Sequence, residues 1–283
     1  MLHLLGYAIG NGGKDTRCCT GPIVVQHALQ QNPVINRSVE WLEHLYPRTT
    51  HTQLAALQDL KDCNERLSSM VEYLLKNKHS FCVIGGDHSS AIGTWSGASK
   101  HQEGPIGLLY IDAHLDAHTQ ASSMTHNIHG MPITALLGQG NPELTKISHP
   151  QPKIDPKHLV FFGTRDYEQQ EYDLIHDLGI TVYDMTTIHS MGIKKALTEA
   201  HNQVASCPFG YGCSIDVDAF DPTQFPAVGN PADNGLDPSE FIDAFKLLKR
   251  DHCLGYEISE FNPSLDFEDK SLSWLIRLLE TFL

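Results

Sequence analysis

Residues 106–116 of the chain read IGLLYIDAHLD, and this stretch decides the expected fold. Its first six residues form an unbroken apolar run, which is typical of a strand buried on both faces of a parallel sheet. The run ends at Ile111, and metal-binding side chains follow at once at Asp112, His114 and Asp116. Because ligands bind outside the carboxyl ends of strands in open parallel sheets, the stretch indicates both a parallel α/β fold and the edge where a site would lie.

Further apolar runs are short enough to be strands, and they alternate with amphipathic segments. They are Leu4–Ile9, Phe81–Ile84, Leu159–Phe162, Ile180–Tyr183 and Tyr211–Ile215. Helical spacing of apolar residues predicts a helix over residues 53–78. Asp237-Pro238 is typical of a helix start, and apolar residues from Leu272 to Leu279 mark a last helix. The alternation predicts a mostly parallel sheet covered on both faces, and no linker divides residues 1–283 into more than one domain.

Composition narrows the classes of partner and compartment. The 283 residues carry 34 acidic and 20 basic side chains, a formal charge of −14, so neither nucleic acid nor an anionic membrane is an expected partner. No apolar stretch approaches the roughly 18 residues of a membrane span, and the N-terminus lacks the basic region of a secretory signal. The seven cysteines are scattered without a CxxC pair, so we expect no disulfide framework and a cytoplasmic location.

Three of the predicted strands run directly into candidate metal ligands. The ligands are His88 after Phe81–Ile84, Asp112, His114 and Asp116 after Ile106–Ile111, and Asp216 and Asp218 after Tyr211–Ile215. A spacing of two residues projects side chains to one side of an extended backbone. Four carboxylates gathered without cations would repel one another, whereas two divalent ions would balance them. The oxygen-rich ligand set favours Mn²⁺ over a structural zinc.

Taken together, the motifs GGDHS at 85–89, DAHLD at 112–116 and SIDVD at 214–218 resemble the signatures of the ureohydrolases, the arginase/agmatinase family. The resemblance covers almost the whole chain. It implies one domain with a three-layer α/β/α sandwich around a mostly parallel eight-stranded sheet, and two manganese ions per subunit. It also implies a homo-oligomer, trimer or hexamer, that hydrolyses a small cationic guanidino substrate to urea and an amine.

The metal site of that family maps onto the residues named above. By this resemblance His88 and His114 would each bind one ion, and Asp112 and Asp216 would help to bridge the two. Asp116 and Asp218 would complete the shell, with Asp116 counted among the catalytic residues. The resemblance further implies that a metal-bridging hydroxide attacks the guanidinium carbon.

Two more catalytic residues follow from the resemblance. Glu260, in ISEFNP at 258–263, matches the glutamate that pairs with the guanidinium, a planar cation that a carboxylate can hold through two parallel hydrogen bonds. His129, in THNIHG at 125–130, matches a histidine proposed to shuttle protons, and it would protonate the leaving amine.

The substrate loops resemble those of arginases and favour cleavage of L-arginine to urea and L-ornithine. Asn127 matches a residue that contacts the substrate α-carboxylate, and Glu168 and Glu171 match acidic residues that hold the α-amino group. Agmatine has no carboxylate, so an agmatinase has little use for such an arrangement. An agmatinase or another guanidino-acid ureohydrolase, of the guanidinobutyrase type, is the alternative within the family.

Four positions in these loops depart from the usual arginase pattern. His118 and Asn230 replace an asparagine and a threonine, and we expect both still to contact the substrate; Thr125 and His126 replace a serine and a glycine. None of the four is a candidate metal ligand, so the chemistry is better supported than the substrate. The chain also ends at Leu283, without the longer tail that some arginases use between subunits.

Two alternatives come from other classes. One is a deacetylase-like hydrolase with a single zinc, which would not need His88 as a ligand. The other is a non-catalytic relative that keeps the fold as a binding module, and such a protein would tolerate the loss of ligands. Gly10-Asn11-Gly12-Gly13 lacks a phosphate-binding pattern and is expected to form a plain turn near the mouth of the site.

Overall fold

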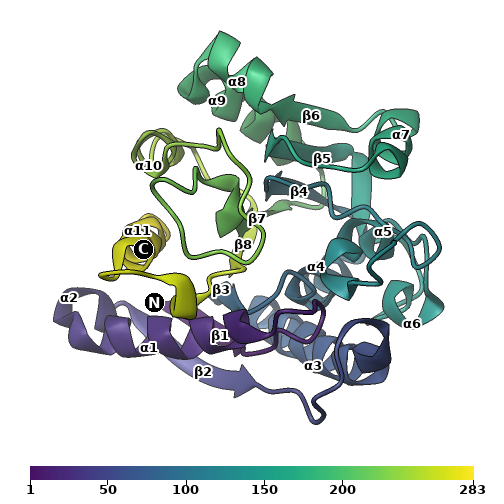
Figure 1. Ribbon diagram of the computed structural model, residues 1–283, viewed down its shortest axis with the longest axis horizontal. Coiled ribbons are helices and arrows are strands. Elements are labelled where there is room, and N and C mark those ends of the chain that lie inside the picture. Colours follow the sequence, from purple (N-terminus) through teal and green to yellow (C-terminus); the bar gives the residue numbers. More distant parts are fainter.

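The computed structural model describes residues 1–283 as one parallel sheet with helices on both sides (Figure 1). The eight strands lie in the order β2-β1-β3-β8-β7-β4-β5-β6, and every neighbouring pair is parallel. They are β1 Leu2–Tyr7, β2 Val39–Leu45, β3 Ser80–Gly85, β4 Ile106–Ile111, β5 Ile154–Thr164, β6 Thr181–Asp184, β7 Tyr211–Asp216 and β8 Cys253–Ser259. The three-layer α/β/α fold expected from the sequence is confirmed, with a sheet that is parallel throughout.

Two separate hydrophobic cores cover the two faces of the sheet. In β4, Leu109 and Ile111 belong to one core while Leu108 and Tyr110 belong to the other, as the alternation of side chains in a strand requires. The first core packs under α1 Gly21–Gln31, α2 Pro33–Asn36, α8 Met185–Met191, α9 Ile193–Ala205, α10 Pro238–Phe245 and α11 Lys270–Glu280. The second packs under α3 Leu57–Lys76, α4 Ser90–Gln102, α5 Pro132–Leu136, α6 Pro142–Thr145 and α7 Gln169–Asp177.

All six apolar runs expected to be strands form strands. The sheet has two further strands, β2 and β8, which the apolar runs did not predict. The sequence of β2, VEWLEHL, mixes polar and apolar residues, and β2 is an edge strand with partly exposed side chains. In β8 the apolar run is interrupted by Gly255 and Glu257, although five of its seven residues are buried. The predicted helix over residues 53–78 begins instead as a 3-10 turn at Gln53–Ala56, followed by α3.

The order of the strands places four chain segments at the centre of the sheet. After β3 the chain crosses to β4 and leaves two positions between them, which β7 and β8 fill much later in the sequence. The carboxyl ends of β3, β8, β7 and β4 are therefore adjacent. This is a switch point of the topology, where open parallel sheets form their binding crevices.

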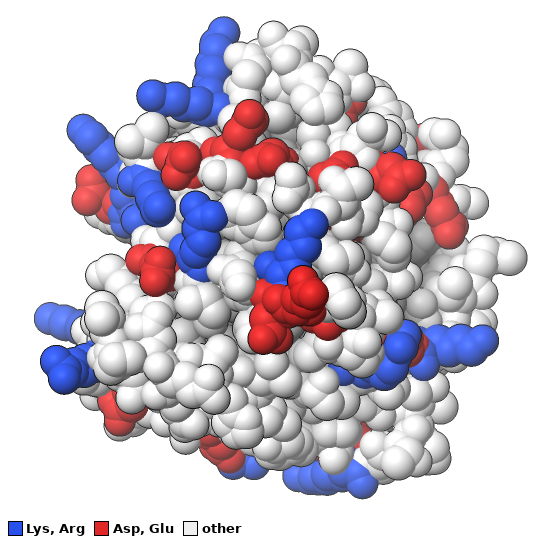
Figure 2. Space-filling view, turned by 60° about the vertical axis from the view of Figure 1, so that its left-hand side comes forward, with Lys and Arg blue, Asp and Glu red and all other residues white.

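On the face of the molecule shown in Figure 2, Lys and Arg side chains stand beside Asp and Glu side chains and do not merge into one basic surface. No helix combines the length and apolar character that crossing a bilayer requires.

Candidate active site

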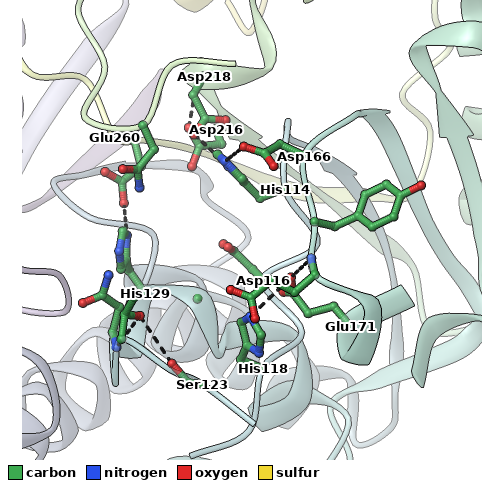
Figure 3. Close-up of a pocket in the computed structure, with 16 residues that line it drawn as sticks. His114, Asp116, His118, Ser123, His129, Asp166, Glu171, Asp216, Asp218 and Glu260 are labelled. Carbon is green, nitrogen blue, oxygen red and sulfur yellow. Dashed lines mark hydrogen bonds and ion pairs between the residues drawn. The ribbon is translucent and has the colours of Figure 1, made fainter. Parts of the chain in front are cut away.

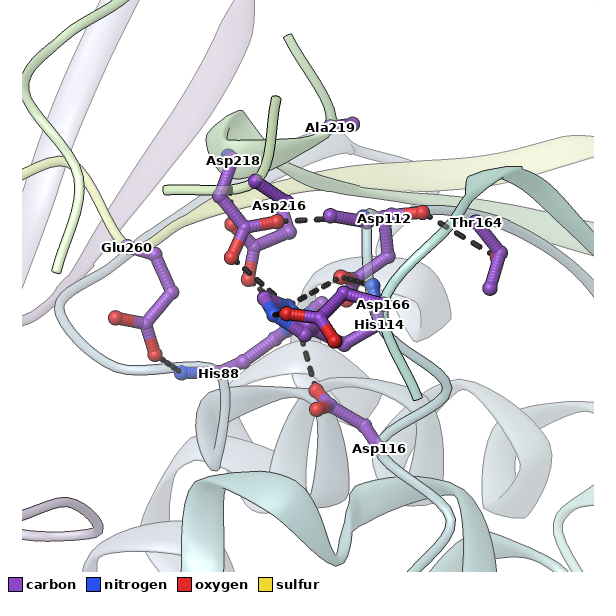
Figure 4. A network of polar contacts seen from close by, with 12 residues as sticks. His88, Asp112, His114, Asp116, Thr164, Asp166, Asp216, Asp218, Ala219 and Glu260 are labelled. Atoms are coloured by element: carbon purple, nitrogen blue, oxygen red, sulfur yellow. Dashed lines mark hydrogen bonds and ion pairs between the residues drawn. The ribbon is translucent and has the colours of Figure 1, made fainter. Parts of the chain in front are cut away.

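His88 lies at the centre of a carboxylate cluster above the carboxyl ends of β3, β4 and β7 (Figure 4). Its Nδ1 lies 3.1 Å from Oδ2 of both Asp112 and Asp216. The same nitrogen lies 3.2 Å from Oδ2 of Asp116. Because His88 is only 1% exposed, one imidazole nitrogen and three carboxylates converge in a space that is almost closed to solvent.

A second group lies beside the first and shares Asp112 with it. His114 Nδ1 is 3.1 Å from Oδ2 of Asp218 and 3.5 Å from Oδ1 of Asp112. Asp112 thus turns one oxygen toward each histidine. On the opposite side of the His114 ring, Nε2 lies 3.7 Å from Oδ2 of Asp166, a carboxylate for which the sequence suggested no role.

Backbone amides hold the carboxylates in place. Oδ1 of Asp112 accepts a hydrogen bond from the backbone N–H of His114 at 2.7 Å, and Oδ1 of Asp216 accepts one from Asp218 at 2.9 Å. These bonds form because Asp112 and Asp216 each lie where a strand ends. The chain turns there and brings the backbone N–H of the residue two positions later to the carboxylate. The second oxygen of Asp112, Oδ2, is buried and accepts no hydrogen bond.

The electrostatics of this cluster favour a divalent cation. Burial, and then the charges of Asp116 and Asp218, raise the pKa of Asp112 to about 6. Burial and the neighbouring carboxylates also raise the pKa of Asp216 well above its usual range. The two sets His88–Asp112–Asp216 and Asp112–His114–Asp218 each place three ligand atoms within 4.8 Å of one another. Buried like charges, an orphaned carboxylate oxygen and convergent hard ligands all fit a divalent metal site.

Glu260 and His129 form a pair on one side of the carboxylate cluster. Oε1 of Glu260 lies 2.9 Å from His129 Nδ1 and accepts a second hydrogen bond from the backbone N–H of His88 at 2.9 Å. Glu260 follows β8 with φ +66°, and Asp116 follows β4 with φ +46°, so both carboxylates sit on left-handed turns. Residues other than glycine with such a positive φ are uncommon, and they cluster at functional sites.

The glycine loop before η1 (Arg17–Thr20) supports His129 from the other side. Gly12 O accepts a hydrogen bond from the backbone N–H of Ile128 at 2.7 Å, and a Cβ at Gly13 would stand 3.0 Å from His129 Nε2. The loop is the plain turn that the sequence indicates, and its lack of side chains lets it pack against the imidazole.

A pocket opens above the carboxylate cluster, and the remaining candidate residues line it (Figure 3). Every candidate site residue lines it except His88 and Asp112, which lie beneath its floor. Seven of the 16 lining residues are acidic and none is Lys or Arg. A pocket of this charge favours a cationic ligand.

Glu168 and Glu171 differ in what they can offer a ligand. Oε1 of Glu171 accepts from the backbone N–H of Ala117 and Oε2 from that of Glu168, both at 3.0 Å, so this carboxylate closes the capping box of α7. The Glu168 side chain is 50% exposed and its Oε2 lies 3.6 Å from His118 Nε2. Glu168 is therefore the freer of the two acidic groups at the mouth.

Asn127 has a partner that the sequence did not reveal. Nε2 of Gln53 donates to Oδ1 of Asn127 at 3.0 Å and to the backbone carbonyl of Thr125 at 2.7 Å. Because Oδ1 is taken, the amide N–H groups of Asn127 remain as donors in the pocket. Gln53 comes from the chain before α3, 74 residues away in sequence, and no local pattern marks it.

The fold and the site together define a class, the metal-dependent hydrolases with a parallel α/β/α sheet and carboxylate-rich metal ligands. Within this class, the sequence profile of the Arginase family matches residues 3–283. The chain belongs to the Arginase family.

Relatives and solved structures agree with this assignment. An arginase of Bacillus caldovelox is 35% identical over 229 residues, which is 81% of this chain and 76% of that protein. The crystal structure of Bacillus subtilis arginase superposes with a TM-score of 0.92 at 30% identity and covers 100% of this chain and 98% of its own. A formiminoglutamase of Trypanosoma cruzi shares the fold at 20% identity, with a TM-score of 0.80 over 99% of this chain and 91% of its own.

The pair of Glu260 and His129 makes the stability of the metal-free protein depend on pH. Burial alone would lower the pKa of His129, but the charge of Glu260 and its hydrogen bond raise that pKa to about 9. An unfolded histidine titrates near 6.5. The pair therefore stabilises the fold fully below about pH 6.5, by on the order of 3 kcal/mol, and this contribution is lost as the pH rises to about 9.

We expect Glu260→Gln to return the pKa of His129 toward its ordinary value and to flatten the pH dependence of unfolding across that window. NMR titration of the histidine rings and urea unfolding at several pH values measure both effects, with exposed Glu268→Gln as the control. An unchanged His129 titration in Glu260→Gln would show that the pairing is absent in solution.

Proposed function

We propose that this protein hydrolyses the guanidino group of L-arginine to urea and L-ornithine, with two Mn²⁺ ions per chain. The observation that carries the proposal is the acidic pocket, in which a cluster of hard ligands forms the floor and Glu260 faces His129 at its side. A guanidinium is a planar cation that such a pocket would attract and orient. Membership of the Arginase family supports the same reaction.

The candidate ligands would divide between the two ions. His88, Asp112, Asp216 and Asp116 would hold one, and Asp112, His114 and Asp218 the other. Of the two aspartates that the family resemblance gives as bridging, Asp112 belongs to both sets, and Asp216 would reach the second ion from the set of His88. When bound, the ions would lower the pKa of water and so supply the nucleophile at neutral pH. Carboxylate and imidazole ligands without thiolates suit Mn²⁺.

The chain's own side chains would orient the substrate and move protons. Oε1 of Glu260 already accepts two hydrogen bonds, so its second oxygen is the one that can receive guanidinium N–H groups. His129, held by Glu260, carries a proton next to the pocket and would deliver it to the departing amine. The buried floor and the capped loops keep these groups in a fixed geometry.

At the mouth, Glu168 would hold the α-ammonium group of the substrate. The free amide N–H groups of Asn127 would donate to the α-carboxylate, together with the side chains of His118 and Asn230. One observation favours a second candidate: His118 Nε2 lies 3.3 Å from Glu171 and 3.6 Å from Glu168, so this ring nitrogen would compete with an α-ammonium group for the same carboxylates. A guanidino acid without the α-amino group, such as 4-guanidinobutyrate, is therefore the alternative substrate.

We further propose a single domain over residues 1–283, a cytoplasmic location and assembly into trimers or hexamers. All seven cysteines are free thiols, which is typical of a reducing compartment. The oligomer is a prediction from the family resemblance.

The substrate is tested by loading the protein with Mn²⁺ and measuring urea release from L-arginine, agmatine, 4-guanidinobutyrate and 3-guanidinopropionate. We expect the highest kcat/KM with L-arginine and no activity after chelation. Preference for 4-guanidinobutyrate would replace L-arginine by the alternative substrate. Release of no urea from any of the four by metal-loaded protein would refute the proposed reaction.

Metal content tests the division of ligands. Asp112→Asn should lose both ions because Asp112 faces both histidines, whereas His88→Asn and His114→Asn should each lose one. In the metal-free state Asp112→Asn should unfold at a higher temperature than the wild type, because one of the repelling charges is gone. Elemental analysis after gel filtration and a thermal melt give these readouts, with surface Asp15→Asn as the control. Two ions retained by Asp112→Asn would contradict its shared position.

Gln53 tests how the substrate carboxylate is recognised. Gln53→Ala frees Oδ1 of Asn127, so KM for L-arginine should rise roughly 3- to 10-fold, as for the loss of one ordinary hydrogen bond, while kcat stays close to that of the wild type. Binding of agmatine, which has no carboxylate, should not change, and exposed Gln58→Ala is the matched control. An equal rise in KM for both compounds would mean that Gln53 does not act through carboxylate recognition.

A further inference from the structure

Glu257 is a carboxylate buried in the middle of the sheet, in the interior of β8. Its side chain is 0% exposed and no Lys or Arg side chain pairs with it. Oε1 accepts a hydrogen bond from the Ser90 hydroxyl at 2.6 Å, and the Thr94 hydroxyl lies 3.3 Å away, with its proton closer to the backbone carbonyl of Ser90 at 2.9 Å. Oε2 accepts from Trp95 Nε1 at 3.0 Å and from the Ser214 hydroxyl at 2.6 Å. Burying a carboxylate is costly, and three short hydrogen bonds, from Ser90, Trp95 and Ser214, offset that cost.

Only one of these donors, Ser214, leads to the candidate metal site. Ser214 Oγ lies 2.6 Å from Glu257 Oε2 and 3.0 Å from His88 Nε2. A serine hydroxyl has a single proton, and here the carboxylate receives it. Ser214 can therefore only accept from His88, so that Nε2 must carry a proton.

The other nitrogen of His88 faces the carboxylate cluster. Nδ1 lies among the oxygens of Asp112, Asp116 and Asp216. The Tyr110 hydroxyl donates its proton to Asp116 Oδ2 at 2.7 Å, so its oxygen accepts from Nδ1 at 2.9 Å. The Tyr110 ring also stacks on the imidazole, with centroids 4.6 Å apart and planes 6° from parallel. The ring is thus confined. Without a metal ion Nδ1 faces only acceptors and carries a proton too; a cation would displace that proton, while the proton on Nε2 is retained, so the Nδ1 lone pair is the one that binds.

We propose that Glu257 is a positioning residue that acts through Ser214: the pair keeps a proton on His88 Nε2 and directs the Nδ1 lone pair at the metal ion bound beside Asp112 and Asp216. The proposal rests on the metal site of the proposed function. It adds two buried residues, Glu257 and Ser214, which support His88 and are not candidate ligands themselves. Partners of this kind orient metal-binding histidines and fix which nitrogen binds.

A purely structural role for Glu257 makes a different prediction. Ser90, Thr94 and Trp95 all come from α4, so their contacts with Glu257 fasten this helix to the sheet. If that were its whole role, changes around Glu257 would lower the free energy of unfolding and leave the affinity for metal unchanged.

The test measures Mn²⁺ affinity by the EPR signal of free Mn²⁺ during titration of the metal-free full chain. Ser214→Ala should weaken one of the two ions about 10- to 100-fold and leave the other within about threefold. Ser90→Ala is the matched control, because it removes a hydroxyl from the same carboxylate without touching His88, and it should stay within about threefold for both ions. Glu257→Leu should reproduce the Ser214→Ala loss, and the double variant should lose no more, since both changes break one pathway.

Glu257→Gln separates the hydrogen bond from the charge and keeps the test decisive if Glu257→Leu does not fold. Trp95 Nε1 can only donate, so it should draw the glutamine oxygen to the Oε2 position and preserve the bond from Ser214. Its metal affinity should therefore lie closer to the wild type than that of Ser214→Ala. With diamagnetic Zn²⁺ in place of Mn²⁺, ¹H–¹⁵N NMR should show His88 protonated at Nε2 in the wild type and in Glu257→Gln.

The possible failures are distinguishable. A wild type that binds no divalent ion would defeat the proposed function itself. Normal metal affinity in Ser214→Ala, or an Nε2 without a proton in the loaded wild type, would overturn the role of Glu257 and leave the proposed function intact. A loss in Ser90→Ala as large as that in Ser214→Ala would assign the effect to the packing of α4.

Discussion

Four carboxylates crowded at the carboxyl edge of a parallel sheet, three of them buried and Asp116 half-buried, are the feature on which the rest of the structure depends. Like charges at such short range repel, and in a solvent-poor space their repulsion is weakly screened. The chain holds them in place with backbone N–H groups at the ends of β4 and β7 and brings His88 and His114 between them. What remains is an excess of negative charge with one unbonded oxygen on Asp112, which a divalent cation would balance.

Burial is distributed unevenly around this cluster. Most groups that would perform the chemistry come from the chain just after the four central strands, and His88, Asp112, Asp216 and Glu260 are buried, whereas those that would select the substrate stand on loops at the mouth, where Glu168 is half exposed. The floor therefore tolerates little change, and the mouth tolerates substitutions such as His118. This division explains why membership of the Arginase family supports the type of reaction more firmly than the particular guanidino compound.

Much of the site could be predicted because its signals are local. An apolar strand that ends in Asp112, His114 and Asp116 shows both the strand and its ligands within eleven residues. What escaped prediction lacks such a signal. In β8 a glycine and Glu257 break the apolar run, although the strand is central, and in β2 polar residues break it because the strand lies at an edge. Gln53 shows no pattern at all, since its importance comes from contact with a loop 74 residues away.

The sequence by itself determined the α/β class, six of the strands and the residues that could bind a metal, because hydrophobic runs and ligand spacing are properties of short segments. Only the tertiary structure decided which segments became neighbours. The insertion of β7 and β8 between β3 and β4 brings His88, Asp112 and Asp216 into one cluster, places Glu260 against His129, and sets Ser214 between His88 and Glu257. Contacts of this kind arise from strand order and long-range packing, which no short segment encodes.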